Sequence, residues 1–219
     1  LAKSLAEDYT IDQSLRFNNG PFLDRTFTGA GDRRNWTFSC WFKMGSTTTA
    51  GGEDYLFSAG TGNSGYTDFL RVYQNKIKFA CIQGGGVNGY KETSAKLRDP
   101  AAWYHLVATY DSDNAEAADR MRLHLNGERI TEFSASADVA LNFESYMFNT
   151  AIDHFVGVYS YNETAAWSGY MAEVYFIDGL ALNADSFGET DAATNQWKPI
   201  DASGLTFGTN GFYQKYAAT

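Results

Sequence analysis

Short runs of alternating apolar and polar residues recur along the chain, with turn-forming residues between them. Runs of this length with a period of two are typical of β-strands, and a regular succession of them indicates an antiparallel sandwich or barrel. The expected strands are Ser14–Asn18, Trp36–Lys43, Tyr55–Ser58, Phe69–Gln74, Lys76–Ile82, Trp103–Tyr110, Met121–Leu125, Arg129–Phe133, His154–Tyr159 and Tyr170–Ile177. Only Ala184–Phe187 and Asn114–Asp119 are expected to form a helical turn.

The run from Arg120 to Arg129 contains the clearest local signal. Asn126-Gly127 interrupts it between alternating apolar residues. Both central positions of a type I′ turn need positive φ, which Asn and Gly tolerate, so this pair predicts a tight hairpin.

The preceding strand, WYHLVATY, has one wholly apolar or aromatic face, formed by Tyr104, Leu106, Ala108 and Tyr110. Alternate residues of a strand point to opposite sides of a sheet, so we expect this face to be in the core. His105 then lies on the other face, as a partly exposed residue.

Length and composition fit a single sandwich. The chain has 219 residues, of which 16% are aromatic, and all-β domains of this size are common. Residues 187–219 have little β-pattern. We therefore expect a sandwich over residues 1–186 and, after it, a C-terminal strap or linker toward a further module.

Charge and cysteine content narrow the possible partners. The net charge is −9, with +2 on residues 1–110 and −11 on residues 111–219. An acidic chain without a Lys/Arg cluster argues against nucleic acid as a partner, and no run approaches the ~18 apolar residues that membrane insertion needs. Cys40 and Cys81 are in phase with apolar neighbours, which favours two buried free thiols over a disulfide.

Several segments resemble the laminin-G-like, concanavalin-A-like jelly-roll superfamily of lectins and glucanases. The matching segments occur in the family's order: SLRF (14–17), NWTFSCWFK (35–43), YLFSAG (55–60), WYHLVATYD (103–111), RLHLNGE (122–128) and WSGYMAEVYFIDGLAL (167–182). The resemblance implies an all-β fold, an antiparallel sandwich of two stacked sheets with about a dozen strands. It also implies a binding or adhesion domain for sugars or proteins, often with Ca²⁺ at one rim.

The C-terminal segment resembles a narrower group. FGE (187–189), WKP (197–199) and FGTNGFY (207–213) are similar to the tails of such domains in virion proteins of marine phages. Gln214-Lys215-Tyr216 replaces the group's more usual Leu-acidic-Phe.

An enzymatic role finds no support in the sequence. Glucanases of this superfamily carry Glu-x-Asp-x-x-Glu on one strand, and this chain has no such string. The three histidines, His105, His124 and His154, lie within expected strands without a nucleophile elbow nearby, and we interpret them as structural. We therefore expect a domain that is not an enzyme.

Calcium is the only candidate cofactor, and the alternative is none. Acidic side chains cluster around one loop and precede a strand, as oxygen ligands for Ca²⁺ would. The candidates are Asp68, Asp111, Asp113 and Asp119. The competing interpretation is a solvated loop in which Asp and Asn favour turns.

Aromatic residues in predicted loops provide candidates for glycan binding, since flat rings can stack against sugars. These candidates are Tyr66, Tyr90, Tyr159, Tyr161, Asn162 and Trp167. A chain this rich in aromatic residues also exposes several by chance.

The strap has aromatic residues but no pattern able to form its own core, so it packs either on this sandwich or on a neighbour. The candidates for an assembly contact are Trp197, Phe207, Phe212 and Tyr213.

These observations favour a non-enzymatic structural or interaction domain of a phage virion, in a tail fibre, a spike or a head decoration. Its expected partners are other virion proteins, further copies of itself and cell-surface glycan. The alternative is a secreted or cell-surface adhesion domain of the lectin type, and a glycoside hydrolase is the third possibility.

Overall fold

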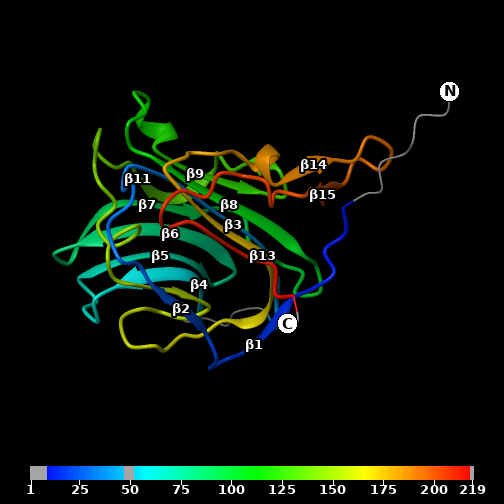
Figure 1. The fold of residues 1–219 in the computed structure, drawn as a ribbon, viewed down its shortest axis with the longest axis horizontal. Helices are drawn as coiled ribbons and strands as arrows, with labels where there is room; N and C mark the ends of the chain where they lie inside the picture. The colour runs from blue at the N-terminus through cyan, green and yellow to red at the C-terminus, as the bar shows by residue number, and fades with distance from the viewer. Residues whose placement is uncertain (1–8, 47–51, 218–219) are drawn as a thin grey trace.

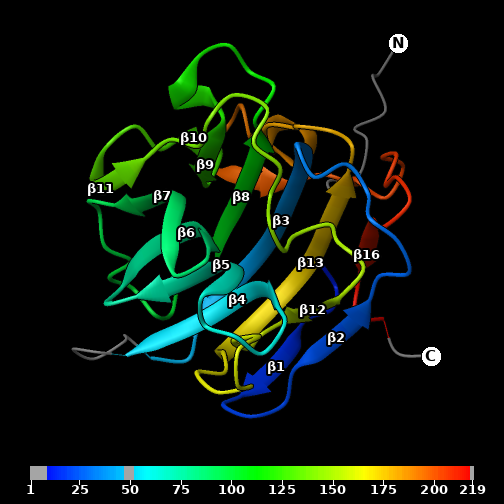
Figure 2. The same ribbon diagram turned by 90° about the vertical axis from the view of Figure 1, so that its left-hand side faces the viewer.

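The computed structural model describes residues 9–46 and 52–217. Within them the chain forms sixteen strands and two three-residue 3₁₀ helices, Ala117–Asp119 and Ala184–Ser186. Every paired strand runs antiparallel to its partners, and two seven-stranded sheets stack face to face (Figures 1 and 2). The predicted all-β jelly-roll sandwich is confirmed.

Sheet A has the spatial order β1 (Leu15–Asn18), β13 (Ser168–Asp178), β3 (Asn35–Met44), β8 (Tyr104–Asp111), β9 (Met121–Leu125) and β10 (Glu128–Arg129), and β16 (Phe212–Gln214) also pairs with β13. Sheet B has the order β11 (Phe133–Ala137), β7 (Gly86–Thr93), β6 (Lys76–Gln83), β5 (Tyr66–Tyr73), β4 (Glu53–Gly60), β12 (Asp153–Val156) and β2 (Leu23–Thr26). A separate ribbon joins β14 (Gly188–Thr190) to β15 (Trp197–Pro199).

Large aromatic side chains fill the space between the two sheets. Trp36 of β3 is fully buried and stacks on Tyr110 of β8, with ring centroids 5.3 Å apart. Leu106, Ala108 and Tyr110 all belong to this core, so the predicted inner face of β8 is confirmed.

Both cysteines are buried in the core as free thiols, Cys40 on β3 and Cys81 on β6, as the sequence predicts. Burial raises the pKa of each thiol, and the neighbouring charge of Asp68 adds to this for Cys81.

The C-terminal strap, residues 187–217, packs on the outer face of sheet A over parts of β8 and β13 (Figure 1). Phe187 and Ala202 of the strap are buried against Val107 of β8 and against Tyr175 and Ile177 of β13. The strap also adds β16 to the edge of sheet A beside β13. It is therefore integrated into the sandwich over the described residues.

This cover corrects the expected exposure of His105, which is 1% exposed. The Trp197 indole donates a hydrogen bond of 2.9 Å to His105 Nδ1, and the two rings stack 5.9 Å apart. Burial lowers the pKa of His105 to about 3, so the ring is neutral at pH 7. Nδ1 accepts from Trp197, and Nε2 therefore carries the proton and donates to Ser39 Oγ.

The predicted Asn126-Gly127 hairpin is confirmed between β9 and β10, with φ of 52° and 84° at the two residues. The glycine has a second role, because a Cβ there would lie 2.3 Å from the Trp197 ring. Turn geometry and strap packing thus both require glycine at this position.

Several strands differ from the sequence prediction. β7 and β2 lie in stretches predicted as loops, the single strand expected at Arg129–Phe133 is divided between β10 and β11, and the strap forms the short strands β14, β15 and β16. Glycines weaken the pattern of β7, and polar residues weaken that of the edge strand β2. The two short helices in the described part of the chain are too short to cross a membrane.

Candidate ligand-binding groove

A groove of about 430 Å³ lies on the outer face of sheet B, the face turned away from the core. Its lining residues come mainly from β4 to β7, with one from β11 and one from the 157–166 loop: Tyr55, Phe69, Arg71, Lys78, Ala80, Ile82, Val87, Tyr90, Ala135 and Tyr159. We call the surface formed by this set of residues the groove.

Strand alternation produces the groove directly. On β5, Leu70 and Val72 point into the core, so Phe69 and Arg71 point outward. On β6 the same alternation turns Lys78, Ala80 and Ile82 outward. The register pairs Phe69 with Ala80 and Arg71 with Lys78, which places an aromatic ring beside a small residue and two cations side by side.

One wall of the groove is a pair of tyrosines. Tyr159, in the loop after β12, stacks on Tyr55 of β4 with ring centroids 4.4 Å apart. The loop turns back on itself, since the Glu163 amide donates to the Tyr159 carbonyl at 2.9 Å. Glu163 has a φ of 54°, as such a tight turn requires.

Arg71 anchors the floor of the groove. Its guanidinium lies 4.8 Å from the Phe69 ring centroid and 5.4 Å from that of Tyr55. It forms an ion pair with Glu53 and donates to the Tyr55 hydroxyl at 2.7 Å. Burial raises the pKa of Tyr55, although the Arg71 charge opposes the shift, and the phenol therefore stays protonated at neutral pH.

The opposite side of the groove is formed by Lys78 and Tyr90. The Lys78 ammonium lies 5.4 Å from the centre of the Tyr90 ring and 3.6 Å from a Glu92 oxygen. Tyr55 and Phe69 are buried beneath the surface, so the groove combines the half-exposed aromatic rings of Tyr90 and Tyr159 with phenol and cationic donors. Such a surface can bind a polar ring-shaped ligand, because apolar faces stack while hydroxyl groups find hydrogen-bond partners.

The structure separates the six predicted glycan-binding residues into three groups. Tyr90 and Tyr159 line the groove. Tyr161 and Asn162 line a neighbouring depression, where Tyr161 is 40% exposed. Tyr66 and Trp167 lie elsewhere.

Two of these predictions need correction. Trp167 is fully buried against Phe42 in the core, so it offers no face to a ligand. Tyr66 lies at the start of β5 on the inward side and packs against Tyr146. The sequence pattern places both residues in loops, whereas strand alternation and core packing decide their direction.

Four residues that form the floor and one wall of the groove escaped prediction from the sequence: Tyr55, Phe69, Arg71 and Lys78. The available signal was the outward phase of the strands at 55–58, 69–74 and 76–82. Residues out of phase with the core positions include two aromatic rings and two cations, an unusual composition for a solvated face.

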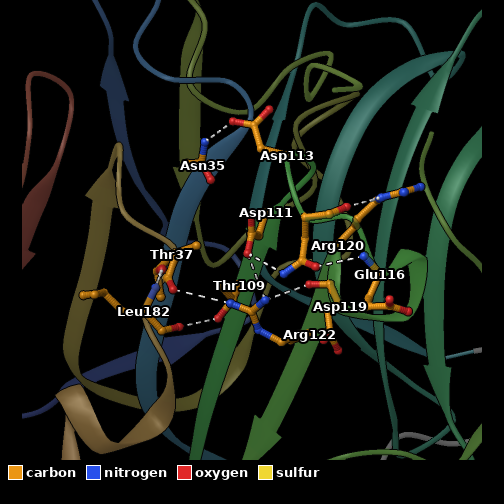
Figure 3. Close-up of polar contacts among 12 residues, drawn as sticks. Asn35, Thr37, Thr109, Asp111, Asp113, Glu116, Asp119, Arg120, Arg122 and Leu182 are labelled. Carbon is orange, nitrogen blue, oxygen red and sulfur yellow. Dashed lines mark hydrogen bonds and ion pairs between the residues drawn. The ribbon is translucent and has the colours of Figure 1, made fainter. Parts of the chain in front are cut away.

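The four predicted calcium ligands do not converge on one site. Asp113 accepts a hydrogen bond from Asn35 at 2.8 Å (Figure 3), and it also pairs with Arg34. Asp119 pairs with Arg129, whose hydrogen bond lowers the pKa of that carboxyl.

Arg122 is the cation at the centre of this loop (Figure 3). Its guanidinium donates to Asp111 Oδ2 at 3.1 Å and to the Asp119 carbonyl at 2.8 Å. A protein side chain therefore neutralises the oxygens that Ca²⁺ would need, and this set of residues does not fit a calcium ion. No metal-binding cluster of three or more His, Cys, Asp or Glu side chains occurs in the part of the chain that the structure describes.

Asp68 is separate from the other three and is fully buried on β5. One of its oxygens accepts hydrogen bonds from Ser145 Oγ, from the Met147 amide and from the Phe148 amide, at 2.7 to 2.8 Å. Burial raises the pKa of Asp68, although these hydrogen bonds oppose the shift. Asp68 thus fixes the 145–148 loop to sheet B, which corrects its assignment as a rim ligand.

The predicted assembly residues lie against this chain's own sandwich. Tyr213 stacks on Tyr175 with centroids 4.3 Å apart and donates to the buried carboxylate of Glu173. Phe207 and Trp197 pack on the same outer face of sheet A, and Phe212 packs against the core. All four are half-buried, which supports the alternative in which the strap covers its own sandwich.

The comparisons with known proteins agree with this fold. The profile of the laminin G family described as the Concanavalin A-like lectin/glucanases superfamily matches residues 18–186, and the chain belongs to this superfamily. No curated protein matches the sequence.

Three solved structures illustrate the similarity. A carbohydrate-binding domain of Ruminococcus gnavus sialidase, bound to α2,3-sialyllactose, has a TM-score of 0.55 and 16% identity, covering 80% of this chain and 93% of that one. A pentraxin from Limulus polyphemus has a TM-score of 0.53 and 16% identity, with 78% and 77% covered. Domains LG4-5 of the mouse laminin α1 chain have a TM-score of 0.54 and 12% identity, with 97% and 49% covered. At such identities the similarity shows a shared fold.

Proposed function

We propose that this concanavalin-A-like domain binds carbohydrate in the groove on the outer face of sheet B. The observation that carries the proposal is the half-exposed ring of Tyr159, which stacks on the buried Tyr55 and faces Tyr90 across a floor that holds Arg71 and Lys78. Aromatic faces suit the apolar side of a sugar ring, and the phenol and cationic donors suit its hydroxyl oxygens. The sialyllactose-bound relative supports the proposal by showing this fold with a bound glycan.

The position of the groove also supports binding. Part of the outer face of sheet A, at β8 and β13, is covered by the strap, whereas the groove on sheet B is lined by half-exposed side chains such as Tyr90 and Tyr159. Most of these side chains project from paired strands, so the surface is largely formed before a ligand arrives. Preorganisation of this kind lowers the entropic cost of binding.

We propose binding without turnover. Retaining glycoside hydrolysis needs an acid and a nucleophile about 5–5.5 Å apart. The charged side chains lining the groove are the two cations Arg71 and Lys78. Glu173, the one glutamate on β13, is buried under the strap and held by Tyr175 and Tyr213.

Alanine substitution of the groove tyrosines tests the proposal. After a glycan array identifies a ligand, Tyr90→Ala and Tyr159→Ala should each weaken binding roughly tenfold, since a central aromatic contact contributes more than about 1 kcal/mol. Tyr170→Ala is the matched control, because Tyr170 is a half-buried tyrosine on sheet A. The proposal is wrong if no glycan binds, or if the Tyr170 variant loses as much affinity.

The biological setting we propose is a virion, where the domain would display the groove toward a cell-surface glycan and contact other virion proteins or further copies of itself. The similarity of segments 187–189, 197–199 and 207–213 to tails of phage virion proteins supports this setting. A secreted or cell-surface adhesion domain is the alternative. Mass spectrometry of purified particles distinguishes the two settings, and detection of the chain only in cell or medium fractions would favour adhesion.

A further inference from the structure

We infer that the groove selects anionic saccharides, which carry a carboxylate or sulfate on a sugar ring. The inference rests on the proposed glycan-binding function and adds the class of ligand. Its basis is that the charged side chains lining the groove are Arg71 and Lys78, in a chain with a net charge of −9. The strand register pairs these two residues directly across β5 and β6.

Lys78 is the cation best placed to receive an anion. Its ammonium lies 3.6 Å from Glu92, which is longer than a normal hydrogen bond. Glu92 has other partners, since Lys76 approaches it at 3.3 Å and Ser134 Oγ at 3.0 Å. Lys78 can therefore turn toward a ligand while Glu92 stays paired.

Arg71 has a supporting role. It is held by Glu53 and by the rings of Phe69 and Tyr55, so the ion pair largely neutralises its charge and its guanidinium fixes the floor beneath the ligand. Lys78 is therefore the cation that carries the selection, on a surface that is already ordered before the ligand binds.

The acidic remainder of the molecule does not oppose this selection at physiological salt. The Debye length there is about 8 Å, so distant exposed carboxylates are screened while groups in direct contact are not. The acidic excess is also concentrated in residues 111–219, whereas the strands β4 to β7 that form most of the groove belong to the half with a net charge of +2.

The test compares trigalacturonic acid with its methyl ester, which keeps the rings and hydroxyl groups but removes the charge. Isothermal titration should show the acid binding about tenfold or more tightly than the ester, with the difference shrinking in high salt. A sulfated disaccharide and its desulfated form make up the second arm, and preference for the charged member in either arm supports the inference and identifies the anion.

Lysine variants provide the matched control. Lys78→Gln should lower affinity for the charged ligand about tenfold and leave the neutral one unchanged, and Lys78→Arg should retain charge selection. Lys43→Gln removes the same charge from β3 of the other sheet, outside the groove, and should retain wild-type affinity.

Three results overturn the inference. These are equal or tighter binding of the neutral member in both arms, equal losses in the Lys43 and Lys78 variants, and binding of neutral glycans alone on an array. In each case glycan binding itself stands. If no glycan binds at all, the proposed function and the inference fail together.

Discussion

At the scale of single residues, the buried polar groups are the ones whose hydrogen-bond partners the structure defines most clearly. Asp68 accepts three hydrogen bonds on one oxygen, while its other oxygen has no hydrogen-bond partner in the described structure. The residue thus has a structural role in holding the 145–148 loop, but it also places an ionisable group in the core. The hydrogen bonds stabilise the folded protein, whereas the buried charge destabilises it. A substitution that removes the charge and keeps the hydrogen-bond acceptor separates the two effects.

We predict that Asp68→Asn leaves the protein at least as stable as the wild type at pH 7, because an amide oxygen can accept the same three bonds without a buried charge. Asp68→Ala should cost about 3 kcal/mol or more, since three buried donors lose their acceptor. Urea unfolding of both variants gives the two free energies.

The pH dependence of folding stability tests whether the buried charge of Asp68 causes this difference. The pKa of Asp68 is raised in the folded protein, so the native state retains its proton to a higher pH than the unfolded chain. Wild-type stability should then fall as pH rises from about 4, the unfolded pKa, through the raised native pKa. Asp68→Asn lacks this fall, and its advantage should grow over that range. A constant or shrinking advantage would contradict the assignment.

At the scale of elements, the strap is an integral part of the sandwich. Its strand β16 pairs with β13, and the Asn210 amide group donates to the carbonyl of Gly29 and to Asn149 Oδ1. The backbone amide of Asn210 donates to Asp178. These contacts join the strap to loops that precede β3 and β12, so it helps to close one end of the fold.

We therefore predict that deleting residues 204–219 lowers the melting temperature by more than about 10 °C, because a strand and several buried hydrogen bonds are lost together. Differential scanning calorimetry measures the shift. Deleting only residues 217–219 is the control, since it retains β16 and Tyr216. A melting temperature within about 2 °C of the wild type after the longer deletion would show that the strap contributes little.

The elements predicted well are those whose strand or turn signal is complete within their own sequence. The alternating residues of β8 and β9 and the Asn126-Gly127 turn are such signals, although both faces of these two strands are buried in the structure. β7 escaped prediction because its stability comes from pairing with β6 and β11 and not from its own glycine-rich sequence.

Long-range packing also accounts for the errors at the candidate site. His105 was expected at the surface, but Trp197, ninety-two positions away, and Phe187 of the strap pack on its ring together with Trp41 of β3. The groove depends in the same way on the register of four strands and on Tyr159 folding back over Tyr55. Alternation within one strand predicts the direction of a side chain, but it does not show which strands will be neighbours.

At the scale of the whole molecule, the two outer faces are different. The strap covers part of sheet A, and sheet B carries the groove. The acidic loop after β8 lies at an end of sheet A, where Asp111 pairs with Arg122 (Figure 3) and two further carboxylates pair with Arg34 and Arg129. Ligand binding on sheet B and charge neutralisation at this loop are therefore separate properties.

We predict that calcium does not stabilise this domain. Asp68 is buried in sheet B, and the other three carboxylates each have an arginine partner, so Ca²⁺ would have to displace Arg122 before it met enough oxygen ligands. A ligand that binds the native state raises stability in proportion to the logarithm of its concentration over Kd, so about 5 mM CaCl₂ and EDTA should give melting temperatures within roughly 1 °C. Arg122→Gln should lower the melting temperature in both conditions, because Asp111 loses its buried partner. A calcium-dependent rise in the wild type that Asp113→Ala abolishes would instead establish a metal site at this loop.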